Sequence, residues 1–190
     1  MATQEKLRKS LEALRNLTKS NQQSSDVAKK KEKIQHCYVI TEAISNPTIR
    51  ISTDFHILLS NSIEAFLRLC DDQDSDVRMT SEECLNRIIR AANDGYIGKI
   101  QIELHKAIKK NGAARPLRTA LWLFSILAHH IRPHKGKPYV ANLFPSLIRI
   151  AERTEESVHE TLALSLPRIM YVLGSFSTEN ETKSLLKAFL

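Results

Sequence analysis

The sequence predicts an all-α fold: a solenoid of stacked helical hairpins, preceded by a short amphipathic helix and a flexible linker. Three similar segments begin at Val77, Leu117 and Val158, so their spacings are 40 and 41 residues. Apolar or small residues follow each start at helical intervals. A period of about 40 to 47 residues with two helices per period is typical of helical solenoids. No segment shows the sustained alternation of apolar and polar residues that a half-buried strand requires.

Composition agrees with a folded, soluble protein. Hydrophobic residues make up 42% of the 190 residues and charged residues 26%, and Gly and Pro are few. The longest apolar run, residues 120–128, is far shorter than the ~20 residues of a membrane-spanning helix. No stretch at the N-terminus resembles a signal peptide. We therefore expect a cytoplasmic protein, in which Cys37, Cys70 and Cys84 are reduced core thiols.

Residues 1–17 are predicted to form an amphipathic helix. One face carries the leucines, and basic residues lie beside it: Leu7, Leu11, Leu14 and Leu17, with Lys6, Lys9 and Arg15. Thr3 is placed to cap the helix. A helix this short is marginal in water when isolated, so we expect an arm that orders on a partner surface. Residues 18–31 are polar and are interpreted as a flexible linker.

The leucine face of this helix allows several interpretations. Leucines flanked by Lys and Arg fit a helix that lies in a membrane interface. They fit equally well a helix that docks in the groove of a partner protein. The spacing fits a nuclear-export signal only loosely. The remaining interpretation is that the helix packs on the chain's own solenoid.

Residues 32–190 are predicted to form the solenoid. A helix over 32–45 is followed by three hairpins and the start of a truncated repeat: about 52–92, 96–131, 137–173 and 178–190. Asn46-Pro47 and Asn111-Gly112 are turn signals between helices. Thr178 has capping-box spacing to Glu181. The apolar face that begins at Leu185 has nothing downstream to cover it, so we expect a fragment of a longer protein.

Charge and motifs exclude most other classes. The first 35 residues carry five more basic than acidic residues, and the other 155 carry only two more, which argues against specific nucleic-acid binding by the body. No phosphate loop or catalytic motif is present. His129, His130 and His134 are explained by an exposed helix end, because Pro133 breaks the alignment that zinc would need. Trp122 fits the core better than a binding hot spot. We expect no enzyme activity and no cofactor.

The hairpins resemble HEAT repeats. Turn acidic residues followed by Val-Arg match that family at Asp72, Asp76, Val77 and Arg78, and its proline-kinked first helix is matched at Leu143, Pro145 and Leu147. In the family, the arginine commonly joins a polar ladder with the turn aspartates of neighbouring repeats. The resemblance therefore implies a HEAT-type α-solenoid with a structural ladder through Asp76, Arg78 and Arg118.

Longer segments are similar to the start of the huntingtin family, over nearly the whole chain. They are residues 1–17, 75–79, 83–86, 108–113, 117–118, 120–122, 155–158, 160–162 and 185–189. The resemblance implies the N-terminal part of a large non-enzymatic scaffold that organises vesicle-transport and autophagy machinery and holds a huntingtin-associated partner. It also implies a cytoplasmic location with shuttling to the nucleus, and peripheral attachment to vesicle or endoplasmic reticulum membranes. The alternative is a stand-alone HEAT adaptor at a membrane surface.

The chain departs from the vertebrate members of that family. Only Gln22-Gln23 stands where they carry a long glutamine tract, and the proline-rich stretch is absent, as in an invertebrate-like member. The regulatory serines of the family's first helix fall at Ala13 and Asn16, whereas Thr3 is retained as a candidate phosphorylation site. Gln4 and Arg8 replace apolar residues, so we expect only weak peripheral membrane contact through residues 1–17.

Overall fold

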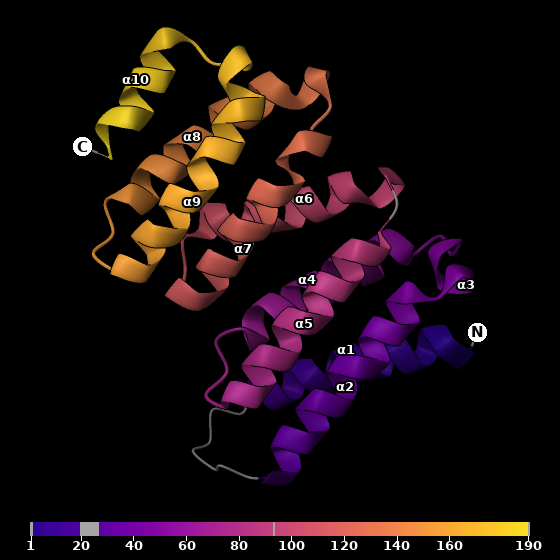
Figure 1. Cartoon of the computed structure of the whole chain (residues 1–190). Helices are drawn as coiled ribbons and strands as arrows, with labels where there is room; N and C mark the ends of the chain where they lie inside the picture. The colour runs from indigo at the N-terminus through magenta and orange to yellow at the C-terminus, as the bar shows by residue number, and fades with distance from the viewer. Residues whose placement is uncertain (1, 20–26, 93, 190) are drawn as a thin grey trace. The chain divides into compact units, whose positions relative to one another are not determined.

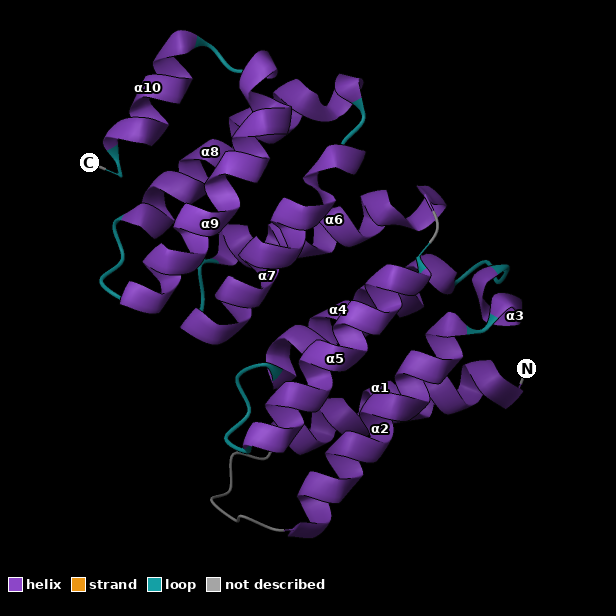
Figure 2. Ribbon diagram, in the orientation of Figure 1, coloured by secondary structure: helices purple, strands orange, loops and turns teal. Residues whose placement is uncertain are grey.

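The computed structural model describes residues 2–19, 27–92 and 94–189 (Figure 1). Within these ranges the chain forms helices and loops without any strand, which confirms the predicted fold class (Figure 2). The α-helices are α1 (Ala2–Lys19), α2 (Val27–Ser45), α3 (Pro47–Arg50), α4 (Phe55–Leu69), α5 (Ser75–Ala91), α6 (Asp94–Lys110), α7 (Ala114–Leu127), α8 (Gly136–Ala151), α9 (Glu156–Leu173) and α10 (Glu179–Lys187). Short 3-10 helices span Ala128–His130, Pro133–Lys135 and Gly174–Phe176. The chain divides into two compact units, Met1–Ile100 (unit 1) and Gln101–Leu190 (unit 2).

The helix boundaries differ from the sequence-based expectation mainly near the N-terminus. Helix α2 begins at Val27 rather than at residue 32, so much of the expected linker is helical. Of that linker, residues 20–26 lie outside the described residues. The short helix α3 was not predicted. It forms because the side chain of Asn46 accepts a hydrogen bond from the Thr48 N–H at 2.9 Å, and Pro47 occupies the first helical position.

Unit 1 differs from the expected arm followed by a solenoid. Helix α1 packs against α2 and α4, while α2 and α4 both pack against α5. Leu7 and Leu14 are only 0% and 1% exposed, and Leu11 and Leu17 are half-buried. Burying a leucine side chain contributes about 1.5–3 kcal/mol, which is enough to hold a short helix in place. Helices α1 and α2 therefore form an additional hairpin beside α4–α5, with the leucine face inside it.

The cysteines lie in the core of unit 1. Cys37, Cys70 and Cys84 are all buried, as their positions in apolar helical patterns predicted. Burial, together with the neighbouring sulfurs and Asp72, raises the pKa of the Cys37 thiol to about 12. The group therefore stays protonated and behaves as a small apolar side chain at neutral pH.

Unit 2 contains residues 101–110 of α6, helix α7 and the predicted hairpin α8–α9. Helices α7 and α9 pack side by side, α8 packs on α9, and α10 packs on α8. The buried side chain of Gln101 donates a hydrogen bond to the Leu127 carbonyl at 2.7 Å, which satisfies an orphan acceptor in the last turn of α7. Thr178 and Glu181 form the predicted capping box at the start of α10.

His105 is expected to make the stability of unit 2 depend on pH. Its ring contacts Phe124 and Tyr139, with centroid distances of 6.3 and 5.6 Å. Its Nε2 is buried without a hydrogen-bond partner among the described residues. Burial lowers the pKa of His105 below its usual 6.5, although a hydrogen bond to the Asn142 backbone raises it; the charge of Lys109 lowers it further. Between the lowered pKa and about pH 6.5, the unfolded chain binds more protons than the folded chain.

The free energy of unfolding of unit 2 is therefore expected to fall as the pH drops below about 6.5 and to level off below the folded pKa. Urea unfolding at a series of pH values measures this slope. A His105→Gln variant, whose side chain does not titrate, should flatten the profile. An equally steep profile in this variant would assign the effect to other groups.

Candidate interaction surfaces

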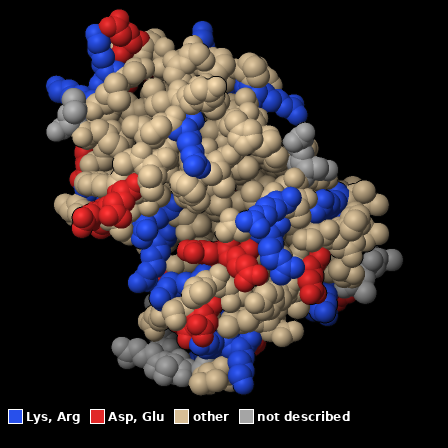
Figure 3. Space-filling model, in the orientation of Figure 1, with Lys and Arg blue, Asp and Glu red and all other residues tan. Residues whose placement is uncertain are grey.

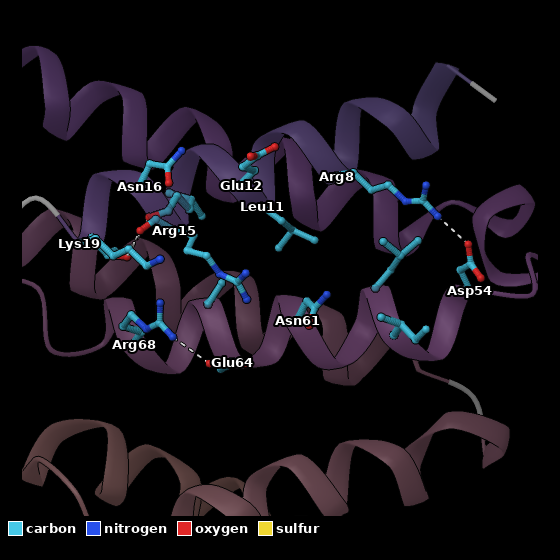
Figure 4. Close-up of a pocket in the computed structure, with 15 residues that line it drawn as sticks. Arg8, Leu11, Glu12, Arg15, Asn16, Lys19, Asp54, Asn61, Glu64 and Arg68 are labelled. Carbon is cyan, nitrogen blue, oxygen red and sulfur yellow. Dashed lines mark hydrogen bonds and ion pairs between the residues drawn. The ribbon is translucent and has the colours of Figure 1, made fainter.

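The first candidate surface is a groove of about 580 Å³ between α1 and α4, within unit 1 (Figure 4). At one end Arg8 forms an ion pair with Asp54 at 2.6 Å. At the other end Arg15 and Lys19 of α1 lie near Arg68 of α4 (Figure 4). Because both signs of charge line the groove, it does not select strongly for an anionic or a cationic ligand.

Some of the residues predicted to bind a membrane or partner are buried in the structure, and others are exposed. Leu7 and Leu14 are buried within unit 1, while Arg15 is exposed and lines the groove with half-buried Leu11. Lys6 and Lys9 are exposed, and Lys9 pairs with Glu5 one turn away at 2.8 Å. Thr3 is exposed as the second residue of α1, rather than standing at the N-cap.

The residues expected to form a polar ladder make different contacts. Arg78 donates to the carbonyl oxygens of Asp72 and Gln73, both at 2.8 Å, and so closes its own turn. Asp76 pairs with Lys30 of α2. Arg118 of α7 donates to the Thr161 hydroxyl of α9 at 3.1 Å. Only the Asp76 and Arg118 contacts therefore join neighbouring hairpins, and neither is an arginine–aspartate pair.

Other basic residues link the turns of neighbouring hairpins. Lys33 of α2 reaches Asp72 in the α4–α5 turn at 2.6 Å. In unit 2, Arg153 donates to the Asn111 side chain at 2.9 Å and to the Gly112 carbonyl at 2.8 Å. Arg153 also bonds to Glu155 and holds the pKa of that carboxyl below its usual value. The sequence analysis did not identify Arg153. The HEAT ladder motif places its arginine in the second helix of a hairpin, whereas Arg153 lies in the turn between α8 and α9.

The turn to which Arg153 donates its hydrogen bonds can be recognised in the sequence. Asn111 has a φ of 49°, in the left-handed region, where asparagine is tolerated better than most residues. The Asn-Gly pair therefore predicted the turn correctly, and the left-handed residue turns its carbonyl and side chain toward a donor. The sequence does not indicate which donor will reach them.

The second candidate surface is formed by α7 and α9 of unit 2. We define the α7–α9 face by exposed residues of these two helices and the 3-10 turn after α7: Trp122, His129, Leu164, Pro167, Arg168 and Tyr171. The expectation that Trp122 belongs to the core is wrong, since its side chain is 39% exposed. Leu121, Leu123 and Phe124 occupy the core instead. Four consecutive apolar residues exceed what one inner helix face can hold, so one of them must face outward.

The α7–α9 face combines a stacked cation with a groove. The guanidinium carbon of Arg168 lies 4.6 Å from the centroid of the Trp122 ring, a cation–π contact between the two helices. Beside it is a groove of about 460 Å³, lined by Ser125, Ile126, His129, Pro167, Arg168, Tyr171 and Val172. Sequence reasoning missed Leu164, Arg168 and Tyr171. The available signal was that apolar residues occur all around residues 162–173, more than a single buried face requires.

Neither surface contains, in its described residues, a cluster of metal-ligating side chains. Among the described residues, no group of three or more His, Cys, Asp or Glu side chains is arranged to hold a metal ion. The described helices are each too short or too polar to cross a membrane.

Comparisons with known proteins place the chain in a family. Residues 66–190 match the family model described as Huntingtin, N-terminal HEAT 1. The whole chain is 46% identical to huntingtin of Takifugu rubripes and covers 6% of that protein. A segment that makes up 42% of the chain is 40% identical to the HD protein homolog of Dictyostelium discoideum and covers 3% of it. The chain thus spans only a small part of the length of these relatives. It belongs to the huntingtin family and contains that family's first N-terminal HEAT region.

Proposed function

We propose that this chain is a protein-docking segment of a non-enzymatic, huntingtin-like scaffold. The observation that carries the proposal is the exposure of large apolar side chains on the α7–α9 face: Tyr171 is 91% exposed and Leu164 is 65% exposed. Trp, Tyr and Arg are the residues most enriched among energetic hot spots of interfaces, and Trp122, Arg168 and Tyr171 supply all three types. Contiguous apolar surface with a polar rim is typical of protein interaction sites.

The partners follow from the family. We propose that the scaffold brings together trafficking and autophagy machinery, including a huntingtin-associated partner, in the cytoplasm and during passage through the nucleus. Several weak docking sites on one chain raise the effective concentration of the partners that they hold. The docking surface of this segment would be one such site.

A second candidate function is reversible attachment to vesicle or endoplasmic reticulum membranes through α1. It is favoured by the leucine face of α1 and by the exposed Lys6 and Lys9 beside it. Insertion would require Leu7 and Leu14 to leave unit 1. Packing therefore competes with the membrane, and the attachment is expected to be weak.

Proximity labelling tests the docking function. The chain is fused to a biotin ligase in cells, and the double variant Trp122→Ala, Tyr171→Ala is compared with the wild type. The variant is expected to lose trafficking and autophagy proteins from the labelled set. A matched control is Met79→Ala, which removes an exposed apolar side chain from α5 of unit 1. Identical labelled sets for all three chains would reject docking through the α7–α9 face.

A further inference from the structure

Unit 2 carries a net positive charge, although the body of the chain as a whole is nearly neutral. Residues 101–190 hold thirteen Lys and Arg against seven Asp and Glu, whereas residues 36–100 hold six against ten. The nearly neutral body inferred from sequence therefore consists of an acidic part followed by a basic part. A partner of unit 2 meets a positive potential rather than a neutral one.

The segments that contribute the residues of the α7–α9 face contain no acidic residue, and the nearest along α9 is Glu160, four residues before Leu164. No Asp or Glu occurs in residues 104–151 or in residues 161–178, which include all of α7 and most of α9. Among the described residues, Arg168 makes no ion pair. The visible surface of unit 2 in Figure 3 is largely uncharged at its centre, where basic side chains are set, and the acidic side chains lie at its top and left edges. The face therefore offers a cation without a counter-charge beside apolar side chains.

The spacing of the exposed side chains suits a helical partner. Leu164, Arg168 and Tyr171 recur at i, i+4 and i+7 and so lie along one side of α9. The groove beside them is lined by residues from both packed helices, among them Ile126 of α7 and Pro167 of α9. An amphipathic helix binds such a groove through apolar side chains at the same spacing.

We propose that the α7–α9 face binds an amphipathic helix of another protein that carries acidic side chains beside an apolar stripe. This inference rests on the proposed docking function and specifies the chemistry of the partner. The apolar stripe packs on Tyr171, Pro167 and Ile126. A carboxylate of the partner accepts hydrogen bonds from the Arg168 guanidinium, which lies over the Trp122 ring. Stacking on the indole holds the guanidinium in place, so little side-chain entropy is lost on binding.

A synthetic helix tests the inference directly. The probe is a fluorescein-labelled peptide of about 18 residues, long enough to form helix, with leucines at i, i+3, i+4 and i+7 and glutamates elsewhere. A second peptide carries lysine in place of every glutamate. Trp122 is the only tryptophan of the chain, so its intrinsic fluorescence reports binding at this face. Anisotropy of the labelled peptide measures affinity for the full chain and its variants.

The acidic peptide is expected to bind and to change the Trp122 emission, whereas the basic peptide binds at least about tenfold more weakly. Tyr171→Ala, at a fully solvated position, should weaken binding of the acidic peptide about tenfold or more, as truncation of a hot spot does. Arg168→Glu should reverse the preference for peptide charge. Ile102→Ala is the matched control, because it removes an exposed apolar residue of α6 in the same unit and should leave affinity unchanged.

Several outcomes would overturn the inference. One is equal binding of both peptides, or binding that Arg168→Glu does not alter. Another is concentration-dependent self-association lost in Tyr171→Ala, which would assign the face to a second copy of the chain. Salt-sensitive binding of an oligonucleotide at this face would assign it to nucleic acid. If neither peptide binds, but the set of labelled proteins still changes in the Trp122→Ala, Tyr171→Ala variant, the face docks proteins and only the proposal of an acidic helical partner is rejected. Peptide binding without any change in labelled partners would reject the docking function instead.

Discussion

Replacing Leu14 with alanine is expected to destabilise the packing of α1 on α2 and α4 by about 2–5 kcal/mol, the usual cost of truncating a fully buried leucine. Leu14 is a residue of α1 and is 1% exposed, and α1 packs against α2 and α4. A solvent-exposed arm would show no such cost. The result therefore separates a first hairpin from a mobile N-terminal extension.

Hydrogen exchange and urea unfolding measure this effect. In the wild type, the amides of α1 should be protected together with those of α2. In Leu14→Ala, α1 should lose protection before the rest of unit 1. Leu11→Ala is the matched control, since Leu11 is on the same helix but only half-buried. Equal effects of both substitutions, with α1 unprotected in the wild type, would contradict the packing of α1.

A variant of α4, on the other side of the groove from α1, tests whether α1 also binds membranes. Leu58 of α4 lines the same groove as Leu14. Leu58→Ala is expected to weaken the packing of α1 against α4, and it leaves the leucine face of α1 intact. If packing and insertion compete for that face, binding to anionic vesicles should increase in this variant. Unchanged vesicle binding, with α1 released, would remove the reason for proposing membrane attachment.

Replacing Gly136 with alanine is expected to destabilise unit 2 by about 1–3 kcal/mol, the usual cost of overpacking. A Cβ at Gly136 would lie 2.4 Å from Cγ and Cδ2 of Phe176, well inside van der Waals contact. Gly136 has the ordinary helical φ of −56°, so the cost arises from space and not from backbone conformation. Phe176 lies in the 3-10 turn after α9, which packs against α8.

A second glycine supplies the control for this prediction. Gly98 lies within α6, and a Cβ there would meet nothing within 4 Å. Gly98→Ala should therefore be neutral or stabilising, because alanine has the higher helix propensity. Thermal unfolding of both variants measures the difference. If Gly136→Ala unfolds at the same temperature as Gly98→Ala, then α8 does not pack against Phe176 as described.

Much of the fold was predictable because it is encoded locally. The helix that starts after Asp74 is capped by that side chain, which accepts hydrogen bonds from the Asp76 and Val77 N–H groups. Thr178 and Glu181 act within one turn in the same way. Such caps and the period of the apolar residues depend only on neighbours in the chain. Fold class and hairpins therefore followed from the residues themselves.

The candidate surfaces were less predictable, for a physical reason that Leu14 and Trp122 illustrate. An apolar periodicity reveals that a helix has an inner face, but burial energy is not directional and does not say what covers that face. The leucines of α1 were expected to stay exposed until α1 binds a partner, but α1 packs against α2 and α4. Trp122, expected inside, is exposed under Arg168 of another helix.

By itself, the sequence determined an all-helical chain of hairpins, with its main turns and the capping box of Thr178 and Glu181, because these rest on contacts within a few residues. Its longer segments also indicated the huntingtin family. Only the tertiary structure decided that α1 joins α2 as a hairpin, that Arg153 bridges two turns, and that α7 and α9 place an arginine over an indole. Each of these depends on residues brought together from distant parts of the chain. Their energies are set by packing and desolvation, which local patterns do not record.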